Sequence, residues 1–166
     1  MVELRSARPA DALALAEVQV ASWHAAYPGL IPAARLAAYT VERRLVAWRR
    51  YLADQGPSTH TRLVEDQQRV VGFVTTGSSR DRSGAGEIWA LYVDPERWGH
   101  GAGSALMADA LATLARRGFR QARLWVLEGN QRAIGFYQGS GFALDGVRMV
   151  EDGLPQVRMT RALTGG

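Results

Sequence analysis

The sequence predicts a mixed α/β fold, and three observations carry this prediction. In order, the chain reads as a strand, two helices, three strands, a helix, a strand, a helix and two strands, which indicates a sheet layered with helices. Residues 87–93 are almost continuously apolar, as in a central strand covered on both faces. The 166 residues, 47% of them hydrophobic, can bury one core, so we expect one domain over residues 1–163 and a flexible tail at 164–166.

The first half of the chain supplies three strands and two helices. The strands are predicted from alternating or apolar stretches at 2–7, 61–66 and 69–76. Pro9 opens the first helix, which Pro28-Gly29 ends. The second helix runs from about 41 to 54 with Thr40 as its N-cap. A polar, glycine-rich loop is expected at 77–86.

The second half is more regular. Its strands are predicted at 87–93, 122–127, 142–149 and 155–162. Pro95 ends the first of these strands, and a glycine loop follows at 99–103. A helix is expected over 104–117, with Gly118 as a natural C-cap, and a shorter helix over 130–138. These segments complete the alternation of strands and helices that defines the predicted fold class.

Composition and charge narrow the classes of protein. All twenty basic residues are arginine, against sixteen acidic residues, which leaves a net charge of +4. Arginine suits phosphate groups, so we expect an anionic ligand, whereas the dispersed excess does not indicate nucleic acid. No apolar run approaches the ~20 residues of a membrane span, and the N-terminus lacks a signal-peptide pattern. We therefore expect a cytoplasmic protein without membrane partners.

Two classes of reactive site are also excluded or disfavoured. Because the chain contains neither cysteine nor lysine, it can form no thiolate site and no Schiff base. The histidines at 24, 60 and 100 lack the spacing of metal ligands, so no metal is expected.

The glycine loop is the first motif with a chemical meaning. In Trp98-Gly99-His100-Gly101-Ala102-Gly103, three glycines at alternate positions precede a helix. The first amides of a helix lack internal partners and carry the positive end of its dipole, so phosphate oxygens bind there when no side chain intervenes. A tight turn would require one glycine; three favour a pyrophosphate. A nucleoside-triphosphate loop requires a lysine, and a dinucleotide loop requires glycine where Leu106 stands.

At these residues the chain resembles the GNAT superfamily of acetyl-CoA-dependent N-acetyltransferases. The loop is similar to the family's Arg/Gln-x-x-Gly-x-Gly/Ala signature, although Trp98 replaces the Arg or Gln and Arg97 stands beside it. The segment 130–142 resembles the family's Asn-x-x-Ala-x-x-Phe-Tyr-x-x-x-Gly-Phe block. Two residues of this segment also have a purely structural interpretation, Asn130 as an N-cap and Tyr137 as a core aromatic. The two motifs together, at the family's usual offset, favour the resemblance.

The resemblance implies an architecture and a coenzyme. We expect a mostly antiparallel central sheet of six to seven strands, flanked by about four helices, in which the parallel strands 87–93 and 122–127 splay apart. Acetyl-CoA, as co-substrate, would fill that gap like an added strand. Backbone groups of Leu91, Tyr92 and Val93, together with Asn130, would bind its pantetheine arm, and an N–H near Leu91 or Tyr92 would hold the oxyanion. The residues implied for the pyrophosphate are Trp98, Gly99, His100, Gly101, Ala102, Gly103 and Ser104.

The implied reaction, acetylation of a primary amine, requires two proton transfers. The pKa of an alkylamine, ~10.4, is about three units above neutral pH. Deprotonating the amine at neutral pH therefore costs ~4 kcal/mol, and a base is needed. Glu87 is the candidate base; on a regular strand it shares a face with Trp89 and Leu91, and burial would raise its pKa. Its alternative is a structural carboxylate paired with an arginine, in which case His24 or a water is the base. Tyr137 is the candidate acid that protonates the thiolate.

The acceptor side is less defined. Trp23, His24 and Tyr27 form an aromatic group that suits a cationic amine, or simply packs two helices together. The acceptor is expected to be a small-molecule amine or a peptide N-terminus. The alternative function is a non-enzymatic acyl-CoA-binding or sensing module of the same fold. The sequence leaves open the identity of the amine, the length of the preferred acyl group and whether the chain forms a homodimer.

Overall fold

The strands form one sheet whose order places β4 beside β5 at its centre. The computed structural model describes residues 2–54, 56 and 58–164. Within them the sheet has the order β1-β2-β3-β4-β5-β7-β6. The strands are β1 (Val2–Ser6), β2 (Thr59–Asp66), β3 (Arg69–Ser78), β4 (Gly86–Val93), β5 (Gln121–Leu127), β6 (Ala143–Glu151) and β7 (Leu154–Ala162). Only the β4–β5 pair in this described part is parallel, which confirms the mostly antiparallel sheet.

The helices agree with the prediction except for one short addition. They are α1 (Ala12–Ala26), α2 (Ala33–Ala37), α3 (Val41–Ala53), α4 (Ala102–Arg116) and α5 (Gln131–Gly139), with 3-10 turns at Pro9–Asp11 and Pro95–Arg97. The helix α2 was not predicted, because five residues are too few for a helical period to show. The helix α4 begins two residues earlier than predicted, since Gly101 is its N-cap in the left-handed conformation. Of the predicted tail, Gly165 and Gly166 lie outside the described residues.

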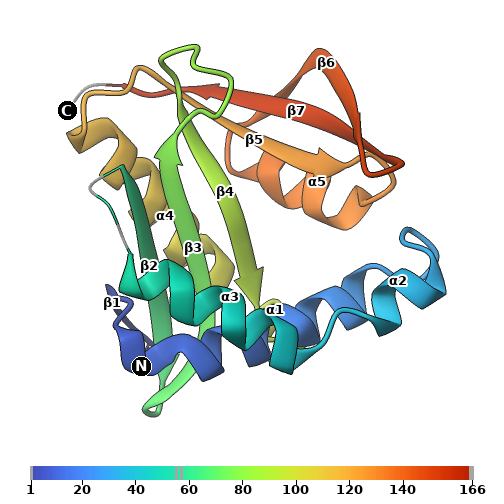
Figure 1. The fold of residues 1–166 in the computed structure, drawn as a ribbon. Coiled ribbons are helices and arrows are strands. Elements are labelled where there is room, and N and C mark those ends of the chain that lie inside the picture. The colour runs from blue at the N-terminus through green and yellow to red at the C-terminus, as the bar shows by residue number, and fades with distance from the viewer. Residues whose placement is uncertain (1, 55, 57, 165–166) are drawn as a thin grey trace.

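Helices cover both faces of the sheet (Figure 1). On one face α1 and α3 pack on Leu63 and Phe73, and this cluster includes Trp48. The sheet has two wings, which meet at β4 and β5: strands β1 to β4 form one, and β5, β7 and β6 form the other, called the β5–β7 wing. On the other face α4 packs on β3 and β4, and α5 packs below the β5–β7 wing. Within the described part of the chain, no helix has the length and hydrophobicity needed to span a membrane.

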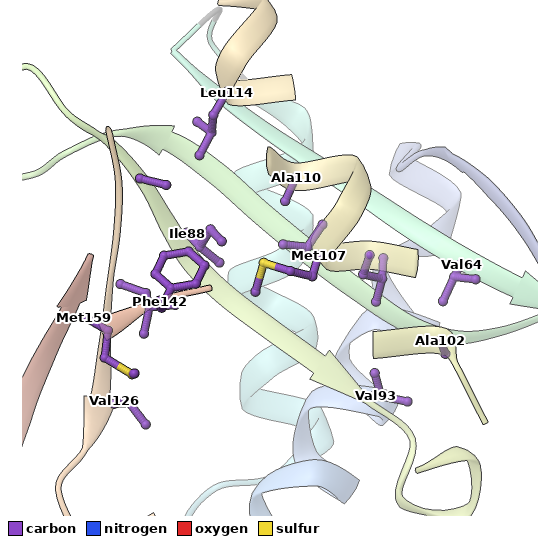
Figure 2. Close-up of a cluster of buried hydrophobic side chains, with 14 of the residues drawn as sticks. Val64, Ile88, Val93, Ala102, Met107, Ala110, Leu114, Val126, Phe142 and Met159 are labelled. Carbon is purple, nitrogen blue, oxygen red and sulfur yellow. The ribbon is translucent and has the colours of Figure 1, made fainter. Parts of the chain in front are cut away.

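The larger core holds the two wings of the sheet together. On α4, Leu106, Ala110 and Leu114 are four residues apart and fully buried, so they form one stripe against the sheet. Figure 2 shows the α4 side chains facing β4, with Phe142 and Met159 approaching from the β5–β7 wing. Because all of these side chains belong to one cluster, α4 fixes the wings relative to each other although β4 and β5 separate.

The central parallel strands pair over only three residues. The register joins Gly86 to Ala122, Glu87 to Arg123 and Ile88 to Leu124, after which β4 and β5 diverge (Figure 1). This confirms the expected splay. The divergence starts beside an irregularity in β4, where Ile88 and Ala90 pair with successive residues of β3 and Trp89 is left as an extra residue.

The irregularity at Trp89 corrects one expectation about Glu87. Ile88 and Leu91, three residues apart, both pack in the α4-side cluster, so regular alternation is broken between them. Glu87 precedes Ile88 and therefore lies on the opposite face from Leu91. The prediction that Glu87 and Leu91 share a face is wrong, because the bulge shifts every later side chain of β4 by one position.

Candidate active site

The splayed strands open into a cavity of about 1140 Å³. Its walls are residues 88–93 of β4 and 124–127 of β5. The glycine loop closes one end, and α5 contributes one side. The cavity brings together most of the residues singled out from the sequence: Trp23, Tyr27, Leu91, Tyr92, Val93, Trp98, Gly99, Gly101, Gly103, Ser104, Asn130 and Tyr137. Glu87, His24, His100 and Ala102 do not line it.

The glycine loop leaves the start of α4 open. Gly99 and Gly101 have φ angles of +78° and +89°, and a Cβ added at either position would meet nothing within 4 Å. These glycines are therefore required for the backbone conformation, and they also keep the first amides of α4 accessible. Ala102 packs into the core, and the ring of His100 approaches the Trp98 carbonyl with its Nδ1 at 2.9 Å. Ala102 can therefore serve a ligand only through its backbone.

Trp98, which replaces the family's Arg or Gln, has a cation stacked on it. Its Nε1–H donates to the Val93 carbonyl at 2.9 Å, which fixes the indole. The guanidinium of Arg132, on α5, lies 3.6 Å from the centre of the indole ring. The neighbouring Arg97 is instead paired with Asp66 at 2.6 Å. Sequence reasoning missed Arg132, whose only signal is its place two residues after Asn130.

Two predicted ligand-binding groups are partly engaged in the fold. The Val93 carbonyl accepts hydrogen bonds from Ser22 Oγ at 2.7 Å and from Trp98 Nε1 at 2.9 Å, which uses both of its lone pairs. The Oδ1 atom of Asn130 accepts from the Ala133 amide at 3.2 Å and caps α5. The side-chain nitrogen of Asn130, Nδ2, can still donate to a ligand in the cavity, so the N-cap role and a ligand role are compatible.

Aromatic side chains form the part of the wall nearest α1. Trp23 Nε1 donates to the Tyr92 hydroxyl at 3.0 Å. The Trp23 ring stacks on Tyr39 at 3.7 Å and meets Tyr27 edge-on at 5.0 Å. These contacts show that Trp23 packs α1 against the segment before α3. Burial raises the pKa of Tyr27 and Tyr92, so both hydroxyls stay protonated at neutral pH.

Tyr137 occupies the α5 side of the cavity. Its ring packs against Phe136 and Phe142 at 5.5 and 6.3 Å between centroids, which fixes its orientation. Burial raises the pKa of the Tyr137 hydroxyl above its ordinary value, with a smaller contribution from Tyr92. The hydroxyl is therefore a proton donor at any physiological pH.

The two candidate bases lie outside the cavity wall. Glu87 is 2% exposed, and its Oε2 atom accepts from Arg80 Nε at 2.7 Å. It is Arg80 that lines the cavity. His24 Nε2 lies 2.9 Å from the Tyr39 carbonyl, and since a carbonyl only accepts, this nitrogen carries the proton. His24 lines a separate groove along the segment 28–37.

The comparisons with known proteins agree with this geometry. The sequence model of the acetyltransferase (GNAT) family matches residues 20–142. The chain belongs to the GNAT family. It is accordingly an acyltransferase by family, and the resemblance inferred from the loop and the 130–142 block is confirmed.

Two of the relatives match most of this chain and are named as N-acetyltransferases. An uncharacterised N-acetyltransferase of Bacillus subtilis, YuaI, is 31% identical and covers 93% of this chain and 92% of its own. An uncharacterised N-acetyltransferase of Mycobacterium tuberculosis, Rv2669, is 34% identical over 83% of this chain and 86% of its own. Among solved structures, the PaiA N-acetyltransferase of Thermoplasma acidophilum in complex with coenzyme A shares the fold at a TM-score of 0.79 and 20% identity, covering 98% and 99% of the two chains.

In this GNAT protein the buried carboxyl of Glu87, which is paired with the exposed Arg80, gives a pH-dependent stability. Burial raises the pKa of the Glu87 carboxyl, and Arg80 opposes the shift without cancelling it. A raised pKa means that the folded state binds the proton more tightly. The stabilising contribution is thus fully present below about pH 4.3 and is lost as pH rises through the raised pKa.

We therefore expect the Tm of the wild type, relative to Glu87→Gln, to fall as pH rises from about 4 to 8. Glutamine does not titrate, so the difference isolates the Glu87 carboxyl. Thermal unfolding of both proteins across this range measures it, with Glu96→Gln, an exposed carboxylate, as control. A difference that instead moved in favour of the wild type with rising pH would show that the Arg80 ion pair dominates.

Proposed function

We propose that this GNAT protein transfers the acetyl group of acetyl-CoA to a primary amine, of a small molecule or a peptide N-terminus, by direct attack in a ternary complex. The observation that carries the proposal is the continuous cavity between β4 and β5, which runs from the open amides of α4 to Tyr137. The space between the two strands therefore connects a candidate phosphate-binding end with a candidate proton donor. We also propose that residues 1–163 form a single domain, which the single sheet supports.

The donor would enter the gap as an additional strand. Its pyrophosphate would bind the amides that follow Gly101, and its pantetheine arm would bind free backbone groups of Leu91 and Tyr92. With the Val93 carbonyl already engaged, the contribution of Val93 is limited to its place at the end of the gap. Arg132, held on Trp98, supplies the cation that the loop sequence itself lacks.

The role of Arg132 predicts a selective loss of affinity. Arg132→Gln should weaken acetyl-CoA binding about tenfold, in the range of a charge-assisted hydrogen bond, and should leave binding of acetyl-pantetheine unchanged because that ligand lacks the phosphates. Titration calorimetry at two salt concentrations measures both ligands. Arg116→Gln, an exposed arginine of α4 that does not line the cavity, is the charge-matched control. An equal loss for both ligands would place Arg132 elsewhere.

The chemistry assigns one proton to each of two groups. The amine nitrogen attacks the thioester carbonyl, a C–N bond forms, the C–S bond breaks, and the amine proton leaves to a base. Tyr137 gives its hydroxyl proton to the departing thiolate, and this role is supported by its fixed ring and its place on the cavity wall. The resulting products are an N-acetyl amine and free coenzyme A.

If Glu87 is the base, a water must carry the amine proton to it. Arg80 lines the cavity, whereas the Glu87 carboxylate that it bonds does not, and a guanidinium cannot itself accept a proton. The amine proton must therefore reach Glu87 through water. If no water makes that connection, Glu87 acts by holding Arg80 at the cavity wall.

A pH profile distinguishes these two roles of Glu87. If Glu87 is the base, kcat/KM of Glu87→Gln should rise with pH toward the pKa of the amine, about 10.4, whereas the wild type levels off earlier. The measurement is kcat/KM from pH 6 to 10 with one fixed acceptor. Arg80→Gln, which breaks the same ion pair but leaves the carboxylate, is the matched variant. A wild-type profile in Glu87→Gln makes the carboxylate structural and leaves His24 or a water as the base.

One experiment tests the proposed function against the alternative of a non-enzymatic acyl-CoA-binding module. Release of free thiol from acetyl-CoA is followed across a panel of primary amines. We expect release that saturates with the concentration of at least one amine. Binding of acetyl-CoA without acceptor-dependent release would favour the binding module.

A further inference from the structure

The charges on the cavity wall are mostly neutralised within the fold. The charged residues of the wall are Arg35, Arg44, Arg80, Arg97, Arg132, Glu151 and Asp152. Three of the arginines have a carboxylate partner: Arg35 with Asp152 at 3.5 Å, Arg80 with Glu87 at 2.7 Å and Arg97 with Asp66 at 2.6 Å. Among the described residues, Arg44 and Arg132 form no ion pair. These two cations are therefore available to a ligand.

Arg132 and Arg44 belong to different parts of the site. Arg132 lies on Trp98 beside the glycine loop, where the phosphates of the proposed donor account for it. Arg44 lies on α3, with its guanidinium 5.5 Å from the centre of the Tyr39 ring. Arg44 lines the cavity together with Trp23 and Tyr92 of the aromatic wall. The acyl end of the donor is uncharged, so the donor gives Arg44 no counter-ion there.

The guanidinium of Arg44 is held in place by a neutral group. Its Nε donates to Gln19 Oε1 at 3.2 Å, and the same oxygen accepts from Trp48 Nε1 at 2.9 Å. Gln19 is buried and is thus a rigid anchor. This leaves the two terminal nitrogens of a half-buried guanidinium, the geometry that binds a carboxylate in bidentate fashion.

The aromatic wall itself is poorly suited to a simple cation. One face of Trp23 is covered by Tyr39, in a stacked pair 3.7 Å apart, and Tyr27 meets the ring edge-on. Arg44 adds a positive charge beside this group. An ammonium ion without a negative partner would therefore be repelled there.

We propose, on the basis of the proposed function, that Arg44 binds a carboxylate carried by the acceptor. The acceptor is then a primary amine with a carboxylate near it. Two sources share this chemistry: a free amino acid, and a peptide whose N-terminal residues include an acidic side chain. Arg44 is a specificity-determining residue, since it contacts the acceptor away from the reacting nitrogen.

Matched acceptor pairs test the proposal. The free amino acid arm compares alanine with alaninamide, and the peptide arm compares Ala-Asp-amide with Ala-Asn-amide. Thiol release gives kcat/KM, expressed per unprotonated amine. We expect the carboxylate member to be favoured by about tenfold or more in one arm, the range of a half-buried charge-assisted contact, and that arm identifies the source.

The variants locate the preference at Arg44. Arg44→Gln should remove the preference by raising KM for the carboxylate acceptor, while kcat, the carboxylate-free acceptor and acetyl-CoA affinity stay within about twofold. Arg44→Lys should restore part of the preference, because the charge returns without the bidentate fork. Arg49→Gln, an exposed arginine of the same helix, is the charge-matched control. Retained acetyl-CoA binding shows that each variant is folded.

The failures of the two proposals are distinguishable. Equal use of both members in both arms, or an equal loss for both members in Arg44→Gln, overturns the role of Arg44 and leaves the acetyltransferase function standing. Turnover of simple amines without turnover of any carboxylate acceptor likewise overturns the role of Arg44 alone. Absence of thiol release with every amine overturns the proposed function and this inference with it.

Discussion

Replacement of Gly101 by valine is expected to weaken acetyl-CoA binding at least about tenfold, equivalent to about 1.4 kcal/mol. No atom lies within 4 Å of an added Cβ at this position, so the new side chain occupies the open space that leads to the first amides of α4. The pyrophosphate must approach through that space. The φ angle of +89° also strains any β-branched residue, at a cost of about 1–3 kcal/mol in stability.

Gly118→Val separates these two effects. Gly118 follows the other end of α4 with a φ angle of +87° and also has nothing within 4 Å of an added Cβ. It does not line the cavity. Both variants should lose a similar amount of Tm, while only Gly101→Val loses affinity for acetyl-CoA by titration calorimetry. Unchanged affinity in folded Gly101→Val would mean that the phosphates bind elsewhere.

Tyr137→Phe is expected to lower kcat by about tenfold or more and to leave acetyl-CoA affinity within a few-fold. Phenylalanine keeps the ring contacts with Phe136 and Phe142 and removes only the hydroxyl. Because burial keeps that hydroxyl protonated, its removal deprives the thiolate of a proton donor. Steady-state kinetics with one fixed acceptor, beside calorimetric titration, measures both quantities.

Tyr51→Phe is the control for loss of a tyrosine hydroxyl. The Tyr51 hydroxyl bonds Thr59 and Thr61 at 3.1 Å, outside the cavity, so this variant should lose stability and keep kcat. Full activity in Tyr137→Phe would show that the thiolate leaves unprotonated and that the tyrosine only packs.

Local patterns were sufficient for the strands, for the helices other than α2, for the glycine loop and for the family. Strand and helix periods, with proline and glycine at their ends, are properties of a few neighbouring residues, so they can be read from the chain. The positive φ angles of Gly99 and Gly101 and the cap formed by Asn130 likewise depend on adjacent atoms. The splay of the central strands followed from the family resemblance rather than from any local pattern.

The tertiary structure decided which side chains face the cavity. The extra residue at Trp89 exists only because β3 pairs with β4, and it reversed the expected face of Glu87 relative to Leu91. The indole of Trp98 carries Arg132 from a different helix, which restores a cation that the loop lacks. Neither contact could be foreseen, since each joins segments whose separation in the sequence carries no periodic signal.

The tertiary structure also decided which arginines of the site are neutralised by a carboxylate. The sequence by itself determined that every basic group is arginine and that an anionic ligand is expected. Only packing decided that Arg80 is neutralised by Glu87 whereas Arg44 is held by the uncharged Gln19. Whether an arginine is free to bind a ligand depends on which groups surround its guanidinium, and that is fixed when distant segments come together around the core.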